Sequence, residues 1–206
     1  MSGKEHWNEV YRARDEEALT WYEAAPGLSM ELIRAHAVPG PAIDVGAGTS
    51  HLVDALLAAG FGPVTAIDLS DEALAISRAR LGEREGEVDW VVGDVTSWQP
   101  APGHSLWHDR AVLHFLTDAD ARAAYVGVMA RALAPGGVAV IGTFAENGPE
   151  KCSGLPVHRY SPEALMAEAE RHAPGRFEVL ETRRHVHVTP KKNRQNFQFS
   201  VLRRRP

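Results

Sequence analysis

The 206-residue chain contains one cysteine, Cys152, which rules out an intramolecular disulfide framework. No apolar run approaches the roughly 20 residues that cross a bilayer as a helix. The first residues, MSGKEHWNEVYRAR, are charged and lack the apolar centre of a secretory signal peptide. Basic residues do not predominate, since 22 Lys and Arg stand against 27 Asp and Glu, a formal net charge of −5. We therefore expect a cytoplasmic protein that binds neither a membrane nor nucleic acid.

Apolar segments typical of strands alternate with segments typical of helices. The expected strands are 42–45, 64–67, 88–92, about 107–112, and 138–144. Helices are expected at 5–13 and 30–37, and after the capping residues Thr49 or Ser50, Ser70, and Thr117 or Asp118. This alternation predicts an α/β fold.

The last third of the chain has a different pattern. Ser161-Pro162 marks a helix start, and 177–188 and 196–202 read as two strands joined by a short loop. The length and the hydrophobic content of 44% are those of one globular domain with a full core. We expect a C-terminal antiparallel hairpin in that domain.

The most informative segment is an apolar strand followed by a glycine-rich turn, Asp44-Val45-Gly46-Ala47-Gly48-Thr49. Gly46 and Gly48 allow a tight turn and a close approach of the backbone to a ligand. Asp68 follows at the end of the next strand, 22 residues beyond Gly46, near the spacing of an acid that binds ribose hydroxyls. The unit predicts a nucleoside pocket at the carboxyl edge of a parallel sheet.

An NAD(P) oxidoreductase would also use this unit. Its fingerprint requires a third small residue at the helix, and here that position is His51. The terminal hairpin also disfavours it.

Three later motifs occur in a definite order. Gly93-Asp94-Val95 follows the third strand, Asp109-Arg110-Ala111-Val112-Leu113-His114-Phe115 ends the fourth, and Leu133-Ala134-Pro135-Gly136-Gly137 leads into the fifth. Together with the glycine turn, they resemble the class I S-adenosylmethionine-dependent methyltransferases over roughly residues 43–144. The resemblance implies a Rossmann-like, seven-stranded, mostly parallel sheet with helices on both faces, in which the hairpin adds the one antiparallel strand. It divides one domain, 1–206, into a helical cap (1–40), a cofactor-binding core (41–145) and a substrate-side loop, helix and hairpin (146–206).

The resemblance also implies roles in binding S-adenosylmethionine. Gly46, Ala47 and Gly48 would line the methionine part, with Asp44 near its ammonium group. Asp68 would accept from the ribose hydroxyls and Leu69 would pack on the adenine; Asp94 would accept from the adenine amino group, with Val95 beside the ring. Arg110 or Ala111 would approach the methionine part. Ser50 stands where this loop often has a third glycine.

Aromatic residues gather in the N-terminal flank. The arrangement of Trp7, Tyr11 and Trp21 is similar to the lead-in of thiopurine- and tellurite-type small-molecule methyltransferases. These rings would cover the cationic sulfonium through cation–π attraction, or they would fasten the N-terminal helix to the core. The sequence leaves both interpretations open.

Methyl transfer from a sulfonium is an in-line displacement, and a base is needed only when the acceptor carries a proton. His114 and Tyr160 are the candidate catalytic residues, with Cys152 and His158 as further candidates for the substrate pocket. His185 and His187 alternate on one side of a strand, but no tight ligand spacing joins them to Cys152 or His114, so no metal site is expected.

The acceptor is expected to be a small-molecule thiol, amine or hydroxyl. The fourth strand ends in Asp109-Arg110-Ala111-Val112 and not in the N/D-P-P-Y/F motif of base N-methyltransferases. A protein lysine side chain is the alternative acceptor. A noncatalytic cofactor-binding protein is the alternative of another class.

Overall fold

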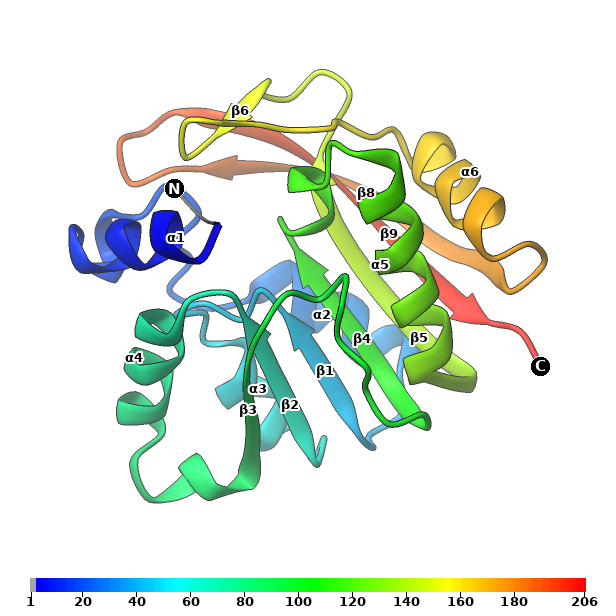
Figure 1. Ribbon diagram of the computed structural model, residues 1–206, viewed down its shortest axis with the longest axis horizontal. Helices are drawn as coiled ribbons and strands as arrows, with labels where there is room; N and C mark the ends of the chain where they lie inside the picture. Colours follow the sequence, from blue (N-terminus) through cyan, green and yellow to red (C-terminus); the bar gives the residue numbers. More distant parts are fainter. Residues whose placement is uncertain (1–2) are drawn as a thin grey trace.

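A seven-stranded sheet forms the centre of the computed structural model, which describes residues 3–206; Met1 and Ser2, the first residues of the expected cap, lie outside the described residues. The strands of this sheet are β1 (Ala42–Val45), β2 (Val64–Asp68), β3 (Val88–Val92), β4 (His104–Arg110), β5 (Leu133–Phe144), β8 (Phe177–Val188) and β9 (Arg194–Arg204). Their order is β3-β2-β1-β4-β5-β9-β8 (Figure 1). β9 runs antiparallel to both of its neighbours, whereas the pairs from β3 through β5 are parallel. The expected Rossmann-like sheet with one antiparallel strand is confirmed.

Helices cover both faces of the sheet, as expected. The helices on one face are α2 (Gly27–His36), α3 (Leu52–Ala58) and α4 (Asp71–Leu81), and those on the other are α5 (Ala119–Ala132) and α6 (Pro162–His172). Three short 3-10 helices join elements: η1 (Glu16–Ala18), η2 (Gly82–Glu87) and η3 (Leu113–Phe115). Because both faces are covered, all four residues of the central strand β1 are buried.

The alternation of side chains along the strands divides the core into two layers. Ala42 and Val64 pack with the layer of α2 and α3, whereas their neighbours Ile43 and Ile67 pack with the layer of α5. The largest buried side chain of the second layer, Trp107, donates from its indole nitrogen to the hydroxyl of Tyr125 at 2.9 Å. The polar atom of this large side chain therefore costs little to bury.

Three of the expected helix caps are present. Ser70 accepts a hydrogen bond from the amide of Ala73, and Ser161 accepts one from the amide of Ala164. Asp118, one of the two expected candidates for the start of α5, accepts from the amides of Asp120 and Ala121. At α3 the N-cap is His51 and makes no side-chain cap bond, while Ser50 accepts from the amide of Leu52 at 3.1 Å.

Strand boundaries differ from expectation where a turn continues a ladder. β5 begins at Leu133, five residues before the expected start. Leu133 pairs with His104 of β4, and the register then shifts, so the turn at Gly136, with φ of +83°, lies within the strand. A small hairpin of β6 (Lys151–Cys152) and β7 (Leu155–Pro156) was not expected. Its strands are too short to show a period-2 pattern.

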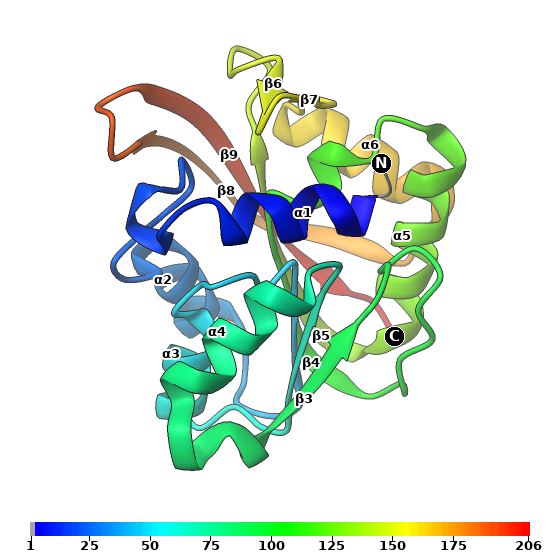
Figure 2. The ribbon, with the colours of Figure 1, turned by 60° about the vertical axis from the view of Figure 1, so that its left-hand side comes forward.

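The carboxyl ends of β1, β2, β3 and β4 lie at one edge of the sheet, where the loops that follow them meet. The first helix, α1 (Gly3–Arg12), lies across this edge (Figure 2). In open α/β sheets this edge is where ligands bind. No helix among the described residues has the length and apolar character needed to cross a membrane.

Candidate active site

A cleft of about 880 Å³, a volume that includes space open to solvent, lies between α1 and the carboxyl edge of the sheet. A second hollow of about 610 Å³ adjoins it and shares Tyr11, Trp21, Gly46 and Arg110. All the residues predicted to bind the cofactor line one or both hollows: Trp7, Tyr11, Trp21, Asp44, Gly46, Ala47, Gly48, Asp68, Leu69, Asp94, Val95, Arg110 and Ala111.

The glycine turn is shaped by close neighbours. Gly46 has φ of +64° and Gly48 has φ of +53°, a backbone region that residues with a Cβ rarely adopt. A Cβ on Gly46 would lie 2.1 Å from a methyl carbon of Val112, and one on Gly48 would lie 2.6 Å from the hydroxyl of Tyr11. Both positions therefore need glycine for conformation and for space.

Asp44 presents an unpaired carboxylate oxygen to the second hollow. Its Oδ1 lies 2.8 Å from Nδ1 of His108, and Nε2 of His108 lies 2.9 Å from the hydroxyl of Ser29. Because a carboxylate oxygen only accepts, Nδ1 of His108 donates to Asp44. Among the described residues, no partner meets the buried Oδ2 of Asp44. An orphaned, buried carboxylate oxygen beside the glycine turn suits a ligand ammonium group.

Asp68 clamps the same turn. Its Oδ2 accepts from the amide of Gly48 at 2.9 Å and its Oδ1 accepts from the amide of Ser70 at 2.8 Å. Each carboxylate oxygen has a second lone-pair site, so Asp68 can also accept from two ligand hydroxyls. Burial raises the pKa of Asp68 to about 6, although the amides of Ser70 and Gly48 act in the opposite direction.

The raised pKa of Asp68 predicts a pH-dependent affinity for S-adenosylmethionine. As pH falls through about 6, protonation weakens Asp68 as an acceptor, and we expect the affinity to fall with it. At neutral pH, Asp68→Asn should bind at least about tenfold more weakly, since a hydrogen bond to a charged acceptor contributes about 1.5–3 kcal/mol. Calorimetric titrations of both proteins across this pH range measure the effect.

Burial also raises the pKa of Asp109 to about 6. The Asp68→Asn variant retains Asp109, so the pH dependence that remains in this variant comes from groups other than Asp68. An unchanged pH profile in the variant would contradict the prediction. In the ligand-free protein, protonation of Asp68 has the opposite effect, because it raises the free energy of unfolding. The folded state holds this proton more tightly than the unfolded chain, so the contribution of Asp68 to the free energy of unfolding falls as pH rises from about 4 to about 6.

The far end of the cleft contains the residues predicted to contact adenine. Asp94 is exposed, and its Oδ1 accepts from the amide and the hydroxyl of Thr96 at 2.8 and 2.7 Å. Both bonds use Oδ1, so Oδ2 is the atom for a ligand amino group. Leu69 and the buried Val95 add apolar surface to this end.

The end of β4 is bent into the cleft by a buried acid that sequence reasoning did not single out. Asp109 accepts from the amides of Val112 and Leu113 at 2.8 and 2.9 Å and from the hydroxyl of Tyr125 at 2.6 Å. The bend holds Ala111 at a φ of +75°, which is uncommon for a residue other than glycine. Strain of this kind persists only where surrounding contacts over-determine it, and here it forms the cleft wall.

An aromatic roof, defined as Trp7, Tyr11, Trp21 and Phe115, covers the cleft. The ring of Trp7 packs edge-on against Trp21 at 5.8 Å and against Phe115 at 5.1 Å, and Tyr11 packs against Trp21 at 6.1 Å. The rings thus line the cleft and also join α1 to η3, so the two interpretations left open by the sequence are compatible.

Hydrogen bonds from α1 to the start of α4 fix the height of the aromatic roof. Asn8 donates to Asp71 at 2.7 Å and accepts from the hydroxyl of Ser70 at 2.7 Å. Lys4 lies 3.1 Å from the same aspartate. Because these contacts tie α1 to α4, the helix that follows β2, the aromatic roof lies over Asp68 at the end of β2.

The two predicted catalytic residues do not line either hollow among the described residues. His114 is fully buried, and its Nδ1 accepts from the amide of Phe144 at 3.2 Å. The neutral ring then carries its proton on Nε2 and has no lone pair free to act as a base. Burial, followed by the charge of Arg110, lowers the pKa of His114 to about 3. Tyr160 is also fully buried, and burial raises the pKa of its hydroxyl. The structure gives these catalytic assignments no support.

Cys152, by contrast, lies in the cleft wall, where its burial raises the pKa of the thiol to about 12. His158 is exposed and stacks its ring 4.6 Å from that of Tyr160. His185 and His187 approach Glu23 and not Cys152 or His114. Glu23 carried no motif in the sequence, and only the folded chain brings it to this strand.

One signal for the support of Asp44 was present in the sequence. His108 pairs in register with Asp44 on the neighbouring parallel strand, and both residues lie shortly before the strand ends. Parallel strands in the predicted order would have placed these two side chains next to each other. Phe115 and Val112 follow the same strand end, but nothing local distinguishes them from ordinary core residues.

Residues 42–137 match the protein family described as a methyltransferase domain. No curated protein sequence matches the chain. Solved structures show the same fold. A protein studied for the conversion of a disulfide bond into a thioacetal group during echinomycin biosynthesis is 21% identical, with a TM-score of 0.77, and the match covers 98% of this chain and 93% of that one.

Two further structures carry names that state their chemistry. A 1,6-didemethyltoxoflavin-N1-methyltransferase from Burkholderia thailandensis, with S-adenosylhomocysteine bound, is 22% identical over 98% of this chain and 84% of that chain, with a TM-score of 0.69. A TehB-like S-adenosylmethionine-dependent methyltransferase from Corynebacterium glutamicum is 20% identical over 99% and 100%, with a TM-score of 0.67. Residues 42–137, the segment that carries the cofactor-binding motifs, therefore match a methyltransferase-domain family, on a fold shared with S-adenosylmethionine-dependent methyltransferases.

Proposed function

We propose that the enzyme methylates an apolar small molecule, held beneath the aromatic roof, by in-line displacement at the methyl group of S-adenosylmethionine. The single observation that carries the proposal is the composition of the cleft. Beyond the residues suited to the cofactor, its lining is mainly apolar and aromatic, with Trp7, Trp21 and Phe115 above and Cys152 to one side. Such a lining favours a compact, apolar acceptor.

The residues that would hold the methyl donor fit its groups in order. Asp44 offers its orphaned oxygen to the ammonium group, Gly46 leaves room for the methionine chain, Asp68 suits the ribose and Asp94 suits the adenine. The donor supplies an activated methyl group on a sulfonium. The protein therefore contributes alignment and the exclusion of water, and alignment of reactants supplies about 7–11 kcal/mol in favourable cases.

Cys152 and Tyr11, which line the cleft, are proton donors at neutral pH. Burial raises the pKa of Cys152 to about 12 and raises that of Tyr11 well above its ordinary value. Burial lowers the pKa of Arg110, but a guanidinium stays charged at neutral pH. Neither Cys152 nor Tyr11 serves as a base, so an acceptor that needs no base fits best; the guanidinium of Arg110, although paired with Glu23 at 2.9 Å, adds a positive charge at the cleft wall. We assign the acceptor to the thiol class, reacting as the thiolate.

A protein lysine side chain is the alternative acceptor. It would reach the cleft as a cation and would need a base to free its lone pair. It would also have to pass the helix that carries Trp7 and Tyr11, which is fastened to α4. Both features favour the small molecule.

Three acceptors with the same ring test the proposal: thiophenol, aniline and phenol. The purified chain is incubated with S-adenosylmethionine and each acceptor, and S-adenosylhomocysteine and the methylated product are quantified. We expect the thiol to react at least about tenfold faster than the other two, and Asp44→Asn to lose activity with all three. Asp89→Asn, at an exposed position on β3, is the matched control and should retain it.

Two results would overturn this proposal. Faster methylation of phenol or aniline would remove the thiol assignment and would require a base. Transfer to lysine peptides alone would replace the small-molecule acceptor by a protein.

A further inference from the structure

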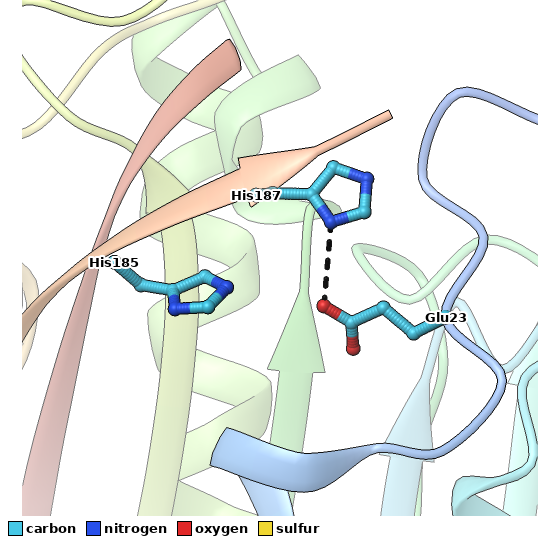
Figure 3. A group of neighbouring side chains, drawn as sticks. All are labelled: Glu23, His185 and His187. Atoms are coloured by element: carbon cyan, nitrogen blue, oxygen red, sulfur yellow. Dashed lines mark ion pairs between the residues drawn. The ribbon is translucent and has the colours of Figure 1, made fainter. Parts of the chain in front are cut away.

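A group of metal-ligand side chains lies where the terminal hairpin meets the N-terminal segment, at the second hollow, which Glu23 lines. Glu23 comes from the connection between η1 and α2, and His185 and His187 come from β8 (Figure 3). One ligand atom from each residue lies within 4.8 Å of the others. The two histidines are two residues apart on one strand, so their side chains leave the same face of the sheet.

The orientation of His187 leaves a lone pair facing a carboxylate. Nε2 of His187 lies 2.8 Å from the carbonyl oxygen of Thr20, to which it must donate. In the neutral ring, Nδ1 is then an acceptor, and it lies 3.4 Å from Oε1 of Glu23. Two acceptors face each other here, and this arrangement requires a cation between them, either a proton or a metal ion. A histidine whose other nitrogen donates to a backbone carbonyl is also the usual state of a metal ligand.

The distances suit an ion of the size of zinc. With bonds of about 2.0–2.2 Å, two ligand atoms on a tetrahedral Zn²⁺ are about 3.3–3.6 Å apart. The 3.4 Å between Nδ1 of His187 and Oε1 of Glu23 lies in this range, and a turn of the Glu23 carboxylate can present Oε2 in place of Oε1. His185 is half-buried, and its ring packs edge-on near that of Phe199 at 6.2 Å, so a rotation about its side-chain bonds can complete the set.

Arg110 is the cation that already faces this group, and its charge opposes a second one. Its Nη2 donates to Oε1 of Glu23 at 2.9 Å, the same oxygen that faces His187. Oε2 is thus the oxygen available to an ion. Arg110 has further contacts, with the carbonyl of Trp21 at 2.9 Å and the face of Phe197 at 5.5 Å, and these can hold it when Glu23 turns.

We infer that Glu23, His185 and His187 form a binding site for a divalent transition-metal ion, with Zn²⁺ as the best fit. Two histidines and one carboxylate are a known donor set for zinc, and three protein ligands leave one position for water or a ligand. The ion would lie behind Arg110, which lines the cleft of the methyl donor. The inference does not depend on the acceptor proposed above, because binding of the ion is measured without a methyl donor.

Calorimetric titration of the metal-free full chain with Zn²⁺ tests the site, and the absorption spectrum of added Co²⁺ reports the ligand geometry. We expect one equivalent to bind saturably, and His185→Asn to bind at least about tenfold more weakly, since even the loss of an outer-shell partner costs about 10–100-fold. His185 is chosen because it is half-buried, so the variant should fold; a thermal melt checks this. His158→Asn, the same change at an exposed histidine, is the control and should bind as the parent does.

Two outcomes would overturn the inference. If a proton already satisfies the pair of His187 and Glu23, Zn²⁺ will bind weakly and equally to the parent chain and to His185→Asn. If another histidine holds the ion, His185→Asn will keep the affinity of the parent. A Glu23→Gln variant provides a second arm, and unchanged zinc affinity in that variant would equally remove the site.

Discussion

Replacing Gly46 by alanine is expected to weaken the binding of S-adenosylmethionine by at least about a hundredfold, or about 2.8 kcal/mol. The new Cβ would lie 2.1 Å from a methyl carbon of Val112. The valine cannot move away easily, because its amide is held by Asp109 and its branched side chain has one preferred rotamer. Val112 is itself part of the cleft wall, so its displacement changes the space that the ligand needs.

Gly60→Ala is the matched control for this substitution. Gly60 has φ of +81°, but nothing lies within 4 Å of a Cβ built there. The control therefore carries the same backbone strain, about 1–2 kcal/mol, without the collision. We expect Gly60→Ala to lose stability and keep its affinity for the methyl donor. Calorimetry on both variants measures the difference, and equal affinities would show that the collision with Val112 does not govern the site.

Arg122→Met is expected to lower the free energy of unfolding by about 3 kcal/mol, at the lower end of the cost of breaking a buried ion pair. The guanidinium of Arg122 donates to Glu168 at 2.7 Å and to the carbonyl of Thr117 at 2.8 Å, and both side chains of the pair are more than 90% buried. Without Arg122, the buried carboxylate of Glu168 between α5 and α6 loses this partner. Arg171 and His172 also contact Glu168, which is why we expect the lower end of the range.

Urea denaturation of Arg122→Met beside Arg84→Met measures this effect. Arg84 pairs with Glu87 on the surface, where both side chains are about half exposed (47% and 51%). Exposed pairs contribute little, so the control should unfold as the parent does. If the two variants lose the same stability, the pair of Arg122 and Glu168 does not stabilise the fold as its burial indicates.

The central sheet was predictable because each of its strands carries a local signal. β1 and β3 begin and end where the apolar runs 42–45 and 88–92 do. The helix starts at Ser70 and Ser161 followed from cap residues, whose hydrogen bonds depend only on neighbours in the chain. The antiparallel hairpin also followed from the sequence, because Phe197, Phe199 and Val201 alternate with polar residues.

The parts of the site that depend on distant segments were not predictable in this way. Glu23 and His187 are far apart in the chain and meet only because β8 lies at the end of the sheet order, beside the N-terminal segment. His114 looked like a residue of the cleft, because it follows a strand at the correct edge. The structure turns it inward, with its ring 4.6 Å from Phe115 and 4.7 Å from Phe144. A sequence position at a strand end fixes the edge, but not the direction of the side chain.

Because α1 is hydrogen-bonded to the start of α4, the docking of α1 and the binding of the methyl donor are linked. Asn8 holds Ser70 through its hydroxyl, and Asp68 holds the amide of the same serine. A methyl donor bound to Asp68 therefore steadies the turn on which α1 rests. Linkage is reciprocal, so a docked α1 must raise the affinity for the donor by the same factor by which the donor favours docking. Truncation of α1 should consequently shorten the residence time of both the donor and the demethylated product.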